Sequence, residues 1–208
     1  SCTRCGLCRD RTQIAFADGA PNARILIVGE APGEHEDKTG VPFAGQSGDQ
    51  LDKILVAAGS ERDKNKVPRT EVFVCNTVLC RPPENRVPTK IEIQACWPRL
   101  LEQIRTVDPD LIVASGKGGA ELLTHRKVSI MAERGSIEDC TFHGPWGPFT
   151  IPVLLTIHPA LILRNPDPNP GGPLRETIND FRTAFAIVDR LREVVHGEKV
   201  KERRYGAR

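Results

Sequence analysis

Apolar residues in the first half of the chain form a short continuous run and then a stretch with helical spacing. The run from Arg24 to Val28 enters a segment rich in glycine and proline, which predicts a buried strand followed by a loop. We expect this loop to continue through GEHEDKTGVPFAGQSG to Asp49, where DQLDKILVAAG begins a helix. The order strand, loop, helix is the repeating unit of an α/β fold.

The same order recurs in the rest of the chain. VFVCNTVLC predicts a second strand, and IEIQACWPRLLEQIRTV predicts a helix with a kink or break near Pro98. DLIVASG and KGGAELLTH predict another strand and helix, and IPVLLTIHPALILRNP predicts a last strand that ends in a loop at His158. Apolar residues at three- and four-residue steps predict a final helix from about Arg175 to His196.

These elements predict one α/β domain with a central, mostly parallel four-stranded sheet flanked by helices. We expect the domain to span residues 1–196 and residues 197–208 to form a basic, flexible tail. The segment NPDPNPGGP is expected to be a rigid surface loop. Ligands of such sheets bind beyond the carboxyl ends of the strands. Functional residues are therefore expected in GEAPGEHED, around Asn76 and in HPALILR.

Composition limits the classes of protein that the chain can belong to. Its 208 residues are 39% hydrophobic, which suits one domain that folds without disulfides. No apolar stretch approaches the roughly 20 residues of a membrane span, and the first residues do not resemble a signal peptide, so we expect a cytoplasmic protein. A net charge of +2 is too small to indicate a nucleic-acid binder by itself.

The seven cysteines are unevenly grouped along the chain. They are Cys2, Cys5, Cys8, Cys75, Cys80, Cys96 and Cys140. In a chain without a secretory signal, a CxxC pair with two distant cysteines more often binds a metal or an iron-sulfur cluster than forms disulfides. Cys75 and Cys140 are expected to be small buried hydrophobic residues.

Four stretches of the chain, taken in order, resemble family 4 of the uracil-DNA glycosylase superfamily, its iron-sulfur members. They are CTRC, GEAPGEHEDKTGVPFAGQSG, CNTVLCRPPENRVP and HPALILRNP. Each stretch alone is a weak signal, but their order matches the family and spans nearly the whole chain. The resemblance implies a uracil-DNA glycosylase-like fold with an N-terminal cluster-binding segment.

The resemblance also implies a cofactor and its ligands. In family 4 the cluster is held by cysteines that correspond here to Cys2, Cys5, Cys80 and Cys96. Four thiolates suit a 4Fe-4S cluster, although four cysteines also fit tetrahedral zinc. Cys8 lies three residues beyond Cys5 and is an alternative ligand to Cys2 or Cys5.

The activity that the resemblance implies is hydrolysis of the bond between uracil and deoxyribose in single- or double-stranded DNA. The enzyme would be a monomer that flips the base into a pocket and leaves an abasic site. Phe43 matches the aromatic residue that stacks on the base, although it would also serve as a core residue. Asn76 matches the residue that reads uracil, and His158 matches the donor to uracil O2.

The first of the two catalytic motifs departs from better-known uracil glycosylases. Ala31 replaces a water-activating aspartate, and Gly33 replaces the tyrosine that excludes thymine. Glu30 is then expected to orient water or stabilise the cationic sugar, while the backbone amides of Gly29 and Glu30 hold the uracil oxygen. Glu36 would fill the space of the tyrosine, unless it belongs to a solvated acidic stretch with its neighbours.

The second motif continues as ALILR and implies contacts with DNA. Its apolar residues are expected to wedge into the duplex, as other DNA-bending proteins insert leucine or isoleucine. The candidates are Leu161, Ile162 and Leu163. Arg164 could then meet phosphate, as could Arg81, Arg86 and Lys117, although each of them alone is more typical of an ordinary surface charge.

Two readings compete with a hydrolytic enzyme. One is a uracil-DNA binder that becomes covalently attached, as some superfamily relatives do with a basic KRRIH loop, which this sequence lacks. The other is an iron-sulfur nucleic-acid binding module that kept the fold without catalysis. A lyase reading would need a buried lysine nucleophile, and the sequence indicates none.

Overall fold

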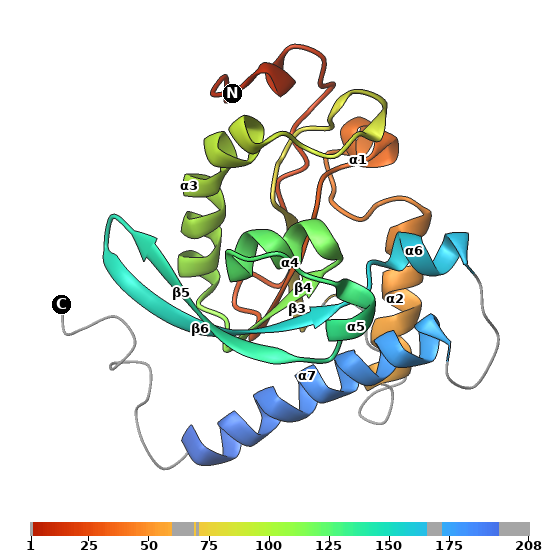
Figure 1. The fold of residues 1–208 in the computed structure, drawn as a ribbon, viewed down its shortest axis with the longest axis vertical. Coiled ribbons are helices and arrows are strands. Elements are labelled where there is room, and N and C mark those ends of the chain that lie inside the picture. Colours follow the sequence, from red (N-terminus) through yellow and green to blue (C-terminus); the bar gives the residue numbers. More distant parts are fainter. Residues whose placement is uncertain (1, 60–68, 70, 166–171, 196–208) are drawn as a thin grey trace.

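The computed structural model describes residues 2–59, 69, 71–165 and 172–195, and it is built around one mixed sheet (Figure 1). The sheet has six strands in the order β1-β3-β2-β4-β6-β5. The strands are β1 Asp18–Gly19, β2 Ile25–Gly29, β3 Val72–Asn76, β4 Leu111–Ser115, β5 Ile137–Gly144 and β6 Gly147–Thr156. The four central strands are mutually parallel, which confirms the predicted parallel core of the sheet.

Sequence patterns missed the two antiparallel edge strands. β1 is only two residues long and pairs with β3. β5 pairs with β6 as a hairpin, and most of its residues are exposed or half-buried, so it lacks the continuous apolar run of a buried strand.

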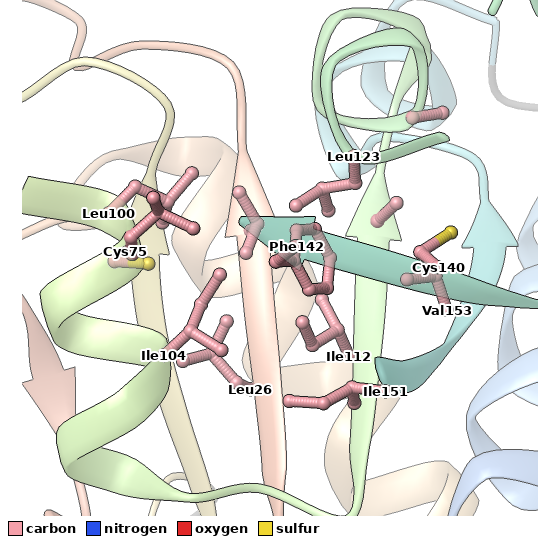
Figure 2. Packing of buried hydrophobic residues seen from close by; sticks show 14 of the residues in the cluster. Leu26, Cys75, Leu100, Ile104, Ile112, Leu123, Cys140, Phe142, Ile151 and Val153 are labelled. Atoms are coloured by element: carbon pink, nitrogen blue, oxygen red, sulfur yellow. The ribbon is translucent and has the colours of Figure 1, made fainter. Parts of the chain in front are cut away.

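Helices cover both faces of the sheet. They are α1 Glu34–Thr39, α2 Gln46–Gly59, α3 Lys90–Val107, α4 Lys117–Thr124, α5 Ile130–Glu133, α6 Pro159–Arg164 and α7 Pro173–Val195, with 3-10 turns at Gly6–Cys8 and Pro83–Asn85. Residues from α3 and α4 pack on one face around Phe142 of β5, as Figure 2 shows. Residues from α2, α6 and α7 pack on the other face. Both faces of β2 and β4 are therefore buried, which explains their uninterrupted apolar sequences.

Two segments that we expected to be loops contain short helices. α1 lies inside the loop after β2, where the Glu36 carboxylate accepts a hydrogen bond from the Gly33 amide (3.0 Å) and Gly40 ends the helix at φ +73°. α2 accordingly begins at Gln46 rather than Asp49. α6 lies inside HPALILR, where Pro159 occupies the first turn.

The other predicted helices agree with the structure more closely. We predicted a kink or a break near Pro98. α3 runs through Pro98 as one continuous helix, so the break is wrong. α7 begins at Pro173, two residues before the expected start, and buries Phe181 and Val188. The basic tail at 197–208 and most of NPDPNPGGP lie outside the described residues. Among the described helices, none is long and apolar enough to cross a membrane.

Candidate active site

A cavity of about 470 Å³ opens at the carboxyl ends of the parallel strands. All three loops in which we expected functional residues contribute to its wall. It is lined by Glu30, Ala31, Pro32, Gly33, Glu36, Phe43, Ser47, Asn76, Pro82, Asn85, Arg86, Val87, Gly116, Lys117, His158, Ala160, Leu161 and Arg164. The arrangement confirms that these loops meet at one edge of the sheet, as the topology rule requires.

Gly29 lets two of the candidate residues approach the sheet closely. Gly29 and Asn76 are register partners at the ends of β2 and β3, and the Thr77 amide donates to the Gly29 carbonyl (3.0 Å). A Cβ on Gly29 would collide with Asn76 Oδ1 and would lie 2.7 Å from Phe43 Cζ. The floor of the cavity therefore consists of a backbone surface on which the Asn76 amide and the Phe43 ring rest.

Phe43 occupies an unusual backbone conformation above this floor. Its φ is +53°, in the left-handed region that non-glycine residues seldom adopt. Its ring is 4% exposed and stacks on the His158 ring, with centroids 5.4 Å apart and planes inclined by 25°. Phe43 also belongs to the core cluster under α2, as its core reading predicts, and it lines the cavity. Its stacking on a base stays a prediction.

His158 is held in one tautomer by the helix that follows it. It precedes a proline, has extended backbone angles, and is the N-cap of α6. Its Nδ1 accepts a hydrogen bond from the Ala160 amide (3.1 Å), so the ring proton of the neutral imidazole is on Nε2. Burial and the nearby Arg164 cation lower the pKa of His158 to about 4, against the opposing effect of Glu36. At neutral pH the cavity thus contains an uncharged Nε2–H donor.

Glu30 lies at the end of β2, against the first turn of α4. A Cβ on Gly118 would be 2.6 Å from Glu30 Cδ, so the carboxyl group packs on the helix backbone. Burial, with a smaller contribution from Glu121, raises the pKa of Glu30 above its ordinary value. A half-buried carboxyl group with a raised pKa in a cavity is a candidate for proton transfer or water positioning.

Glu36 is not part of a solvated acidic stretch. It is 7% exposed, and its carboxylate accepts hydrogen bonds from the amides of Gly33 (3.0 Å) and Gly45 (3.1 Å). Asp37 is also buried and accepts from the Thr12 amide, whereas Glu34 lies on the surface beside Lys38. Glu36 therefore fixes the loop across the cavity wall and lies near His158.

The three residues of the predicted DNA wedge differ in how far they are buried. Ile162 is 5% exposed and packs in the core beneath α6, so its burial in this structure does not support the wedge role predicted for it. Leu163 is 41% exposed, while Leu161 is half-buried and lines the cavity. Arg164 lines the cavity at the end of the same helix.

The other basic candidates differ in their partners. Arg86 forms two hydrogen bonds with the Glu92 carboxylate, at 2.9 and 2.7 Å, and Arg81 donates to Asn85 (2.8 Å). Lys117 lines the cavity with a side chain that is 63% exposed, 3.8 Å from Glu121.

A second cavity, of about 530 Å³, lies between the N-terminal cysteines and residues of the β3–α3 loop and α3. It is lined by Cys2, Thr3, Arg4, Cys5, Cys8, Arg11, Ile14, Phe16, Leu79, Cys80, Ala95, Cys96 and Arg99. The N-terminal segment lies beside the beginning of α3, which carries Cys96 (Figure 1). Residues far apart in the sequence thus place five thiols around one space.

The four predicted ligands influence one another within this space. Burial raises the pKa of Cys96, and the thiols of Cys5, Cys80 and Cys2 raise it further, while the Leu79 amide opposes them. Arg11 Nη1 donates to Cys80 Sγ at 3.2 Å. In the described chain no three His, Cys, Asp or Glu side chains are already arranged as metal ligands, so the fit rests on this shared cavity and on the soft thiol donors.

Cys75 and Cys140 lie apart from that cavity. Both are buried in the core cluster on the α3 face of the sheet (Figure 2), which confirms that they are small buried hydrophobic residues. Burial raises the pKa of Cys75 to about 12 and that of Cys140 to about 11, so both thiols stay protonated.

Residues 16–182 match the family model described as the Uracil DNA glycosylase superfamily. The fold is thus that of a class of DNA base-excision proteins, and the chain belongs to the uracil-DNA glycosylase superfamily. A type-4 uracil-DNA glycosylase from Thermotoga maritima is 42% identical over 167 residues, which cover 79% of each chain. Type-4 uracil-DNA glycosylases from Pyrobaculum aerophilum and Sulfurisphaera tokodaii are 34% and 37% identical to this chain. Each match covers 80% of this chain, and the matches cover 81% and 73% of those two proteins.

Sequence reasoning missed the loop between β4 and α4. Gly116 has φ +89°, and a Cβ there would lie 2.9 Å from His158 Cβ, so this glycine makes room for the histidine. The signal was present, because the segment SGKGG follows a buried strand just as GEAPG does. The exposed Val87, which lines the cavity, gave no comparable signal.

The tautomer of His158 can be tested directly. We expect nitrogen NMR at neutral pH to show a protonated Nε2 and an unprotonated Nδ1, with no protonation down to about pH 5, because burial lowers the pKa. The unfolded chain would take up this proton near the ordinary value of 6.5, so the free energy of unfolding should decrease as the pH falls from 6.5 toward about 4. An imidazolium with both nitrogens protonated at pH 7 would contradict this assignment.

Proposed function

We propose that the chain is a monofunctional uracil-DNA glycosylase, which hydrolyses the N-glycosidic bond of uracil in DNA and leaves an abasic site that begins base excision repair. The observation that carries the proposal is the convergence of the Asn76 amide, the Phe43 ring and a neutral His158 on one cavity of about 470 Å³. The type-4 uracil-DNA glycosylases that the chain resembles support the same activity.

Recognition of the base is assigned to the floor and one wall of the cavity. A base must leave the duplex to reach this space, since its reactive bond is otherwise inside the stack. We assign the Phe43 ring, which lines the cavity, to apolar contact with the extruded base. The Asn76 amide can donate to O4 and accept from N3–H of uracil, a pattern that cytosine reverses.

Catalysis is assigned to two side chains that line the cavity, His158 after β6 and Glu30 after β2. As the bond breaks, negative charge gathers on uracil O2, and the His158 Nε2–H stabilises it by a hydrogen bond. A neutral donor suits this step, because it need not first lose or gain a proton. Glu30 orients the attacking water or stabilises the cationic sugar, and the backbone amides of Gly29 and Glu30 hold the uracil oxygen.

Monofunctional hydrolysis agrees with the position of the lysine in the cavity. A Schiff base requires an uncharged amine, which burial or a neighbouring cation normally provides. Lys117 instead has a largely exposed side chain near Glu121. We assign it, with Arg164, to the DNA backbone, and we assign the exposed Leu163 to the gap that the flipped base leaves in the duplex.

We further propose that Cys2, Cys5, Cys80 and Cys96 hold a 4Fe-4S cluster. The four thiols share one cavity, and sulfur donors suit iron-sulfur clusters. A bound cluster would act as a structural cross-link between the N-terminal segment, the β3–α3 loop and α3. Arg4, Arg11 and Arg99 also line that cavity, and their positive charge would balance a cluster with four thiolates.

Oligonucleotides that differ only in one base test the activity. We expect alkali-labile abasic sites in DNA with uracil and none in DNA with cytosine, and we expect Asn76→Ala to lower the single-turnover rate by about 100-fold or more because one recognition group is lost. Asn179→Ala, on the exposed side of α7, is the matched control and should retain the wild-type rate.

Two other outcomes identify the competing readings. Protein that stays attached to uracil-containing DNA after denaturation would support covalent binding. DNA binding without any base release, by a protein that retains its cluster, would support a binding module.

The close packing at Gly29 predicts a second loss of activity. Gly29→Ala would push its new methyl group against the Asn76 amide and the Phe43 ring, and displacement of these groups should slow uracil excision by about 100-fold. Gly59→Ala is the control, because a Cβ there meets Phe185 at an ordinary 3.8 Å. Wild-type excision by Gly29→Ala protein would show that the cavity floor is not used for the base.

The cluster can be tested by metal content and visible absorption of protein purified without oxygen. We expect Cys80→Ala to lose iron and absorption, because one thiolate ligand is missing. Cys75→Ala removes a thiol buried in the core and should keep both signals. Cys8→Ala should also keep them, and loss of iron in that variant would assign Cys8 as a ligand. Zinc in place of iron in the wild-type protein would contradict the cluster.

A further inference from the structure

Arg69 makes an unusually complete set of contacts close to the candidate active site. Its Nε and Nη2 donate to the Asp52 carboxylate of α2 at 2.8 and 3.5 Å, and its Nη1 donates to Asp18 of β1 at 2.6 Å. The same guanidinium donates to two backbone carbonyls, from Nη1 to Pro42 (3.1 Å) and from Nη2 to Phe43 (2.6 Å). All five N–H donors of the guanidinium are therefore used.

The two carbonyls belong to the turn that places Phe43 over the cavity. Phe43 has φ +53°, and a non-glycine residue stays in this region only where its surroundings enforce it. Gly48, in the first turn of α2, makes room for the Phe43 carbonyl, since a Cβ there would collide with it. The Arg69 side chain is only 12% exposed, so its bonds to the turn are largely shielded from water.

We propose that Arg69 is a positioning residue for uracil excision, because its guanidinium holds the Pro42–Phe43 turn so that the Phe43 ring stacks in the base cavity. The two aspartates orient the guanidinium from separate elements, the edge strand β1 and the helix α2. Arg69 does not line the cavity, and it acts through Phe43. This inference rests on the proposed function for its effect on catalysis, but its geometric part is independent of that function.

Lysine is the sharpest replacement for Arg69. It keeps the positive charge and can still pair with an aspartate, but its three donors cannot reach both carboxylates and both carbonyls in the planar pattern of a guanidinium. We expect Arg69→Lys to lower the single-turnover excision rate by about 100-fold, as small displacements of positioning groups do. Arg126→Lys is the matched control, because Arg126 also pairs with two carboxylates, Glu133 and Glu138, away from the cavity, and it should retain the wild-type rate.

A double-mutant cycle separates positioning from general destabilisation. If Arg69 acts through the Phe43 ring, Arg69→Lys should change the rate by less than about twofold when Phe43→Ala is already present. An equal loss in both backgrounds would overturn the proposal, and so would a wild-type rate in the Arg69→Lys protein. Thermal unfolding of each variant, followed in parallel, identifies any protein that fails to fold.

A structural readout keeps the inference testable even if the proposed function is wrong. The Phe43 ring stacks on His158, so its ring current should shift the proton signals of the His158 ring, and Phe43→Ala identifies the size of that shift. We expect Arg69→Lys to move these signals toward their positions in the Phe43→Ala protein. Unchanged signals in Arg69→Lys would overturn the positioning role. Absence of uracil excision in the wild-type protein would instead overturn the proposed function alone.

Discussion

The candidate active site depends on the missing side chain of Gly29. This residue ends the central strand β2, and its bare backbone supports both the Asn76 amide and the Phe43 ring. Parallel pairing with β3 places Asn76 beside it. Gly116, just before α4, and Gly118, in the first turn of α4, make the same kind of room for His158 and Glu30. Close backbone approach therefore sets the shape of the cavity, and the polar groups occupy positions that this backbone leaves open.

The electrostatics of the cavity follow from the same construction. His158 caps α6 through Nδ1, so the helix that begins there also decides which nitrogen bears the proton. Burial keeps the His158 imidazole neutral and raises the pKa of Glu30. Glu36 instead accepts one hydrogen bond from a backbone amide on each of its carboxylate oxygens. The three groups therefore have different roles, as a fixed donor, a proton-sensitive carboxyl group and a structural carboxylate.

Sequence patterns anticipated the parallel core and the residues that gather at its edge, because buried strands have continuous apolar runs and ligands bind where such strands end. They did not anticipate α1 or α6, since short helices depend on local caps such as Glu36 and Pro159 more than on periodicity. They assigned Ile162 to the DNA wedge together with its neighbours, because without α6 the sequence does not show that Ile162 packs in the core. The role of Arg69 could not be predicted from local patterns, because all of its hydrogen-bond acceptors lie at least 17 residues away in the sequence.

One segment joins the two cavities, and its position would give the proposed cluster a structural role. Residues 82–87 provide part of the active-site wall, and they lie between Cys80 and Cys96. The Arg86–Glu92 pair already ties this wall to the first turn of α3. A cluster bound to both cysteines would close the same segment into a covalently cross-linked loop, which restricts its freedom in the unfolded chain and in the folded protein. The proposed cluster would therefore stiffen the active-site wall, although its cysteines line a separate cavity.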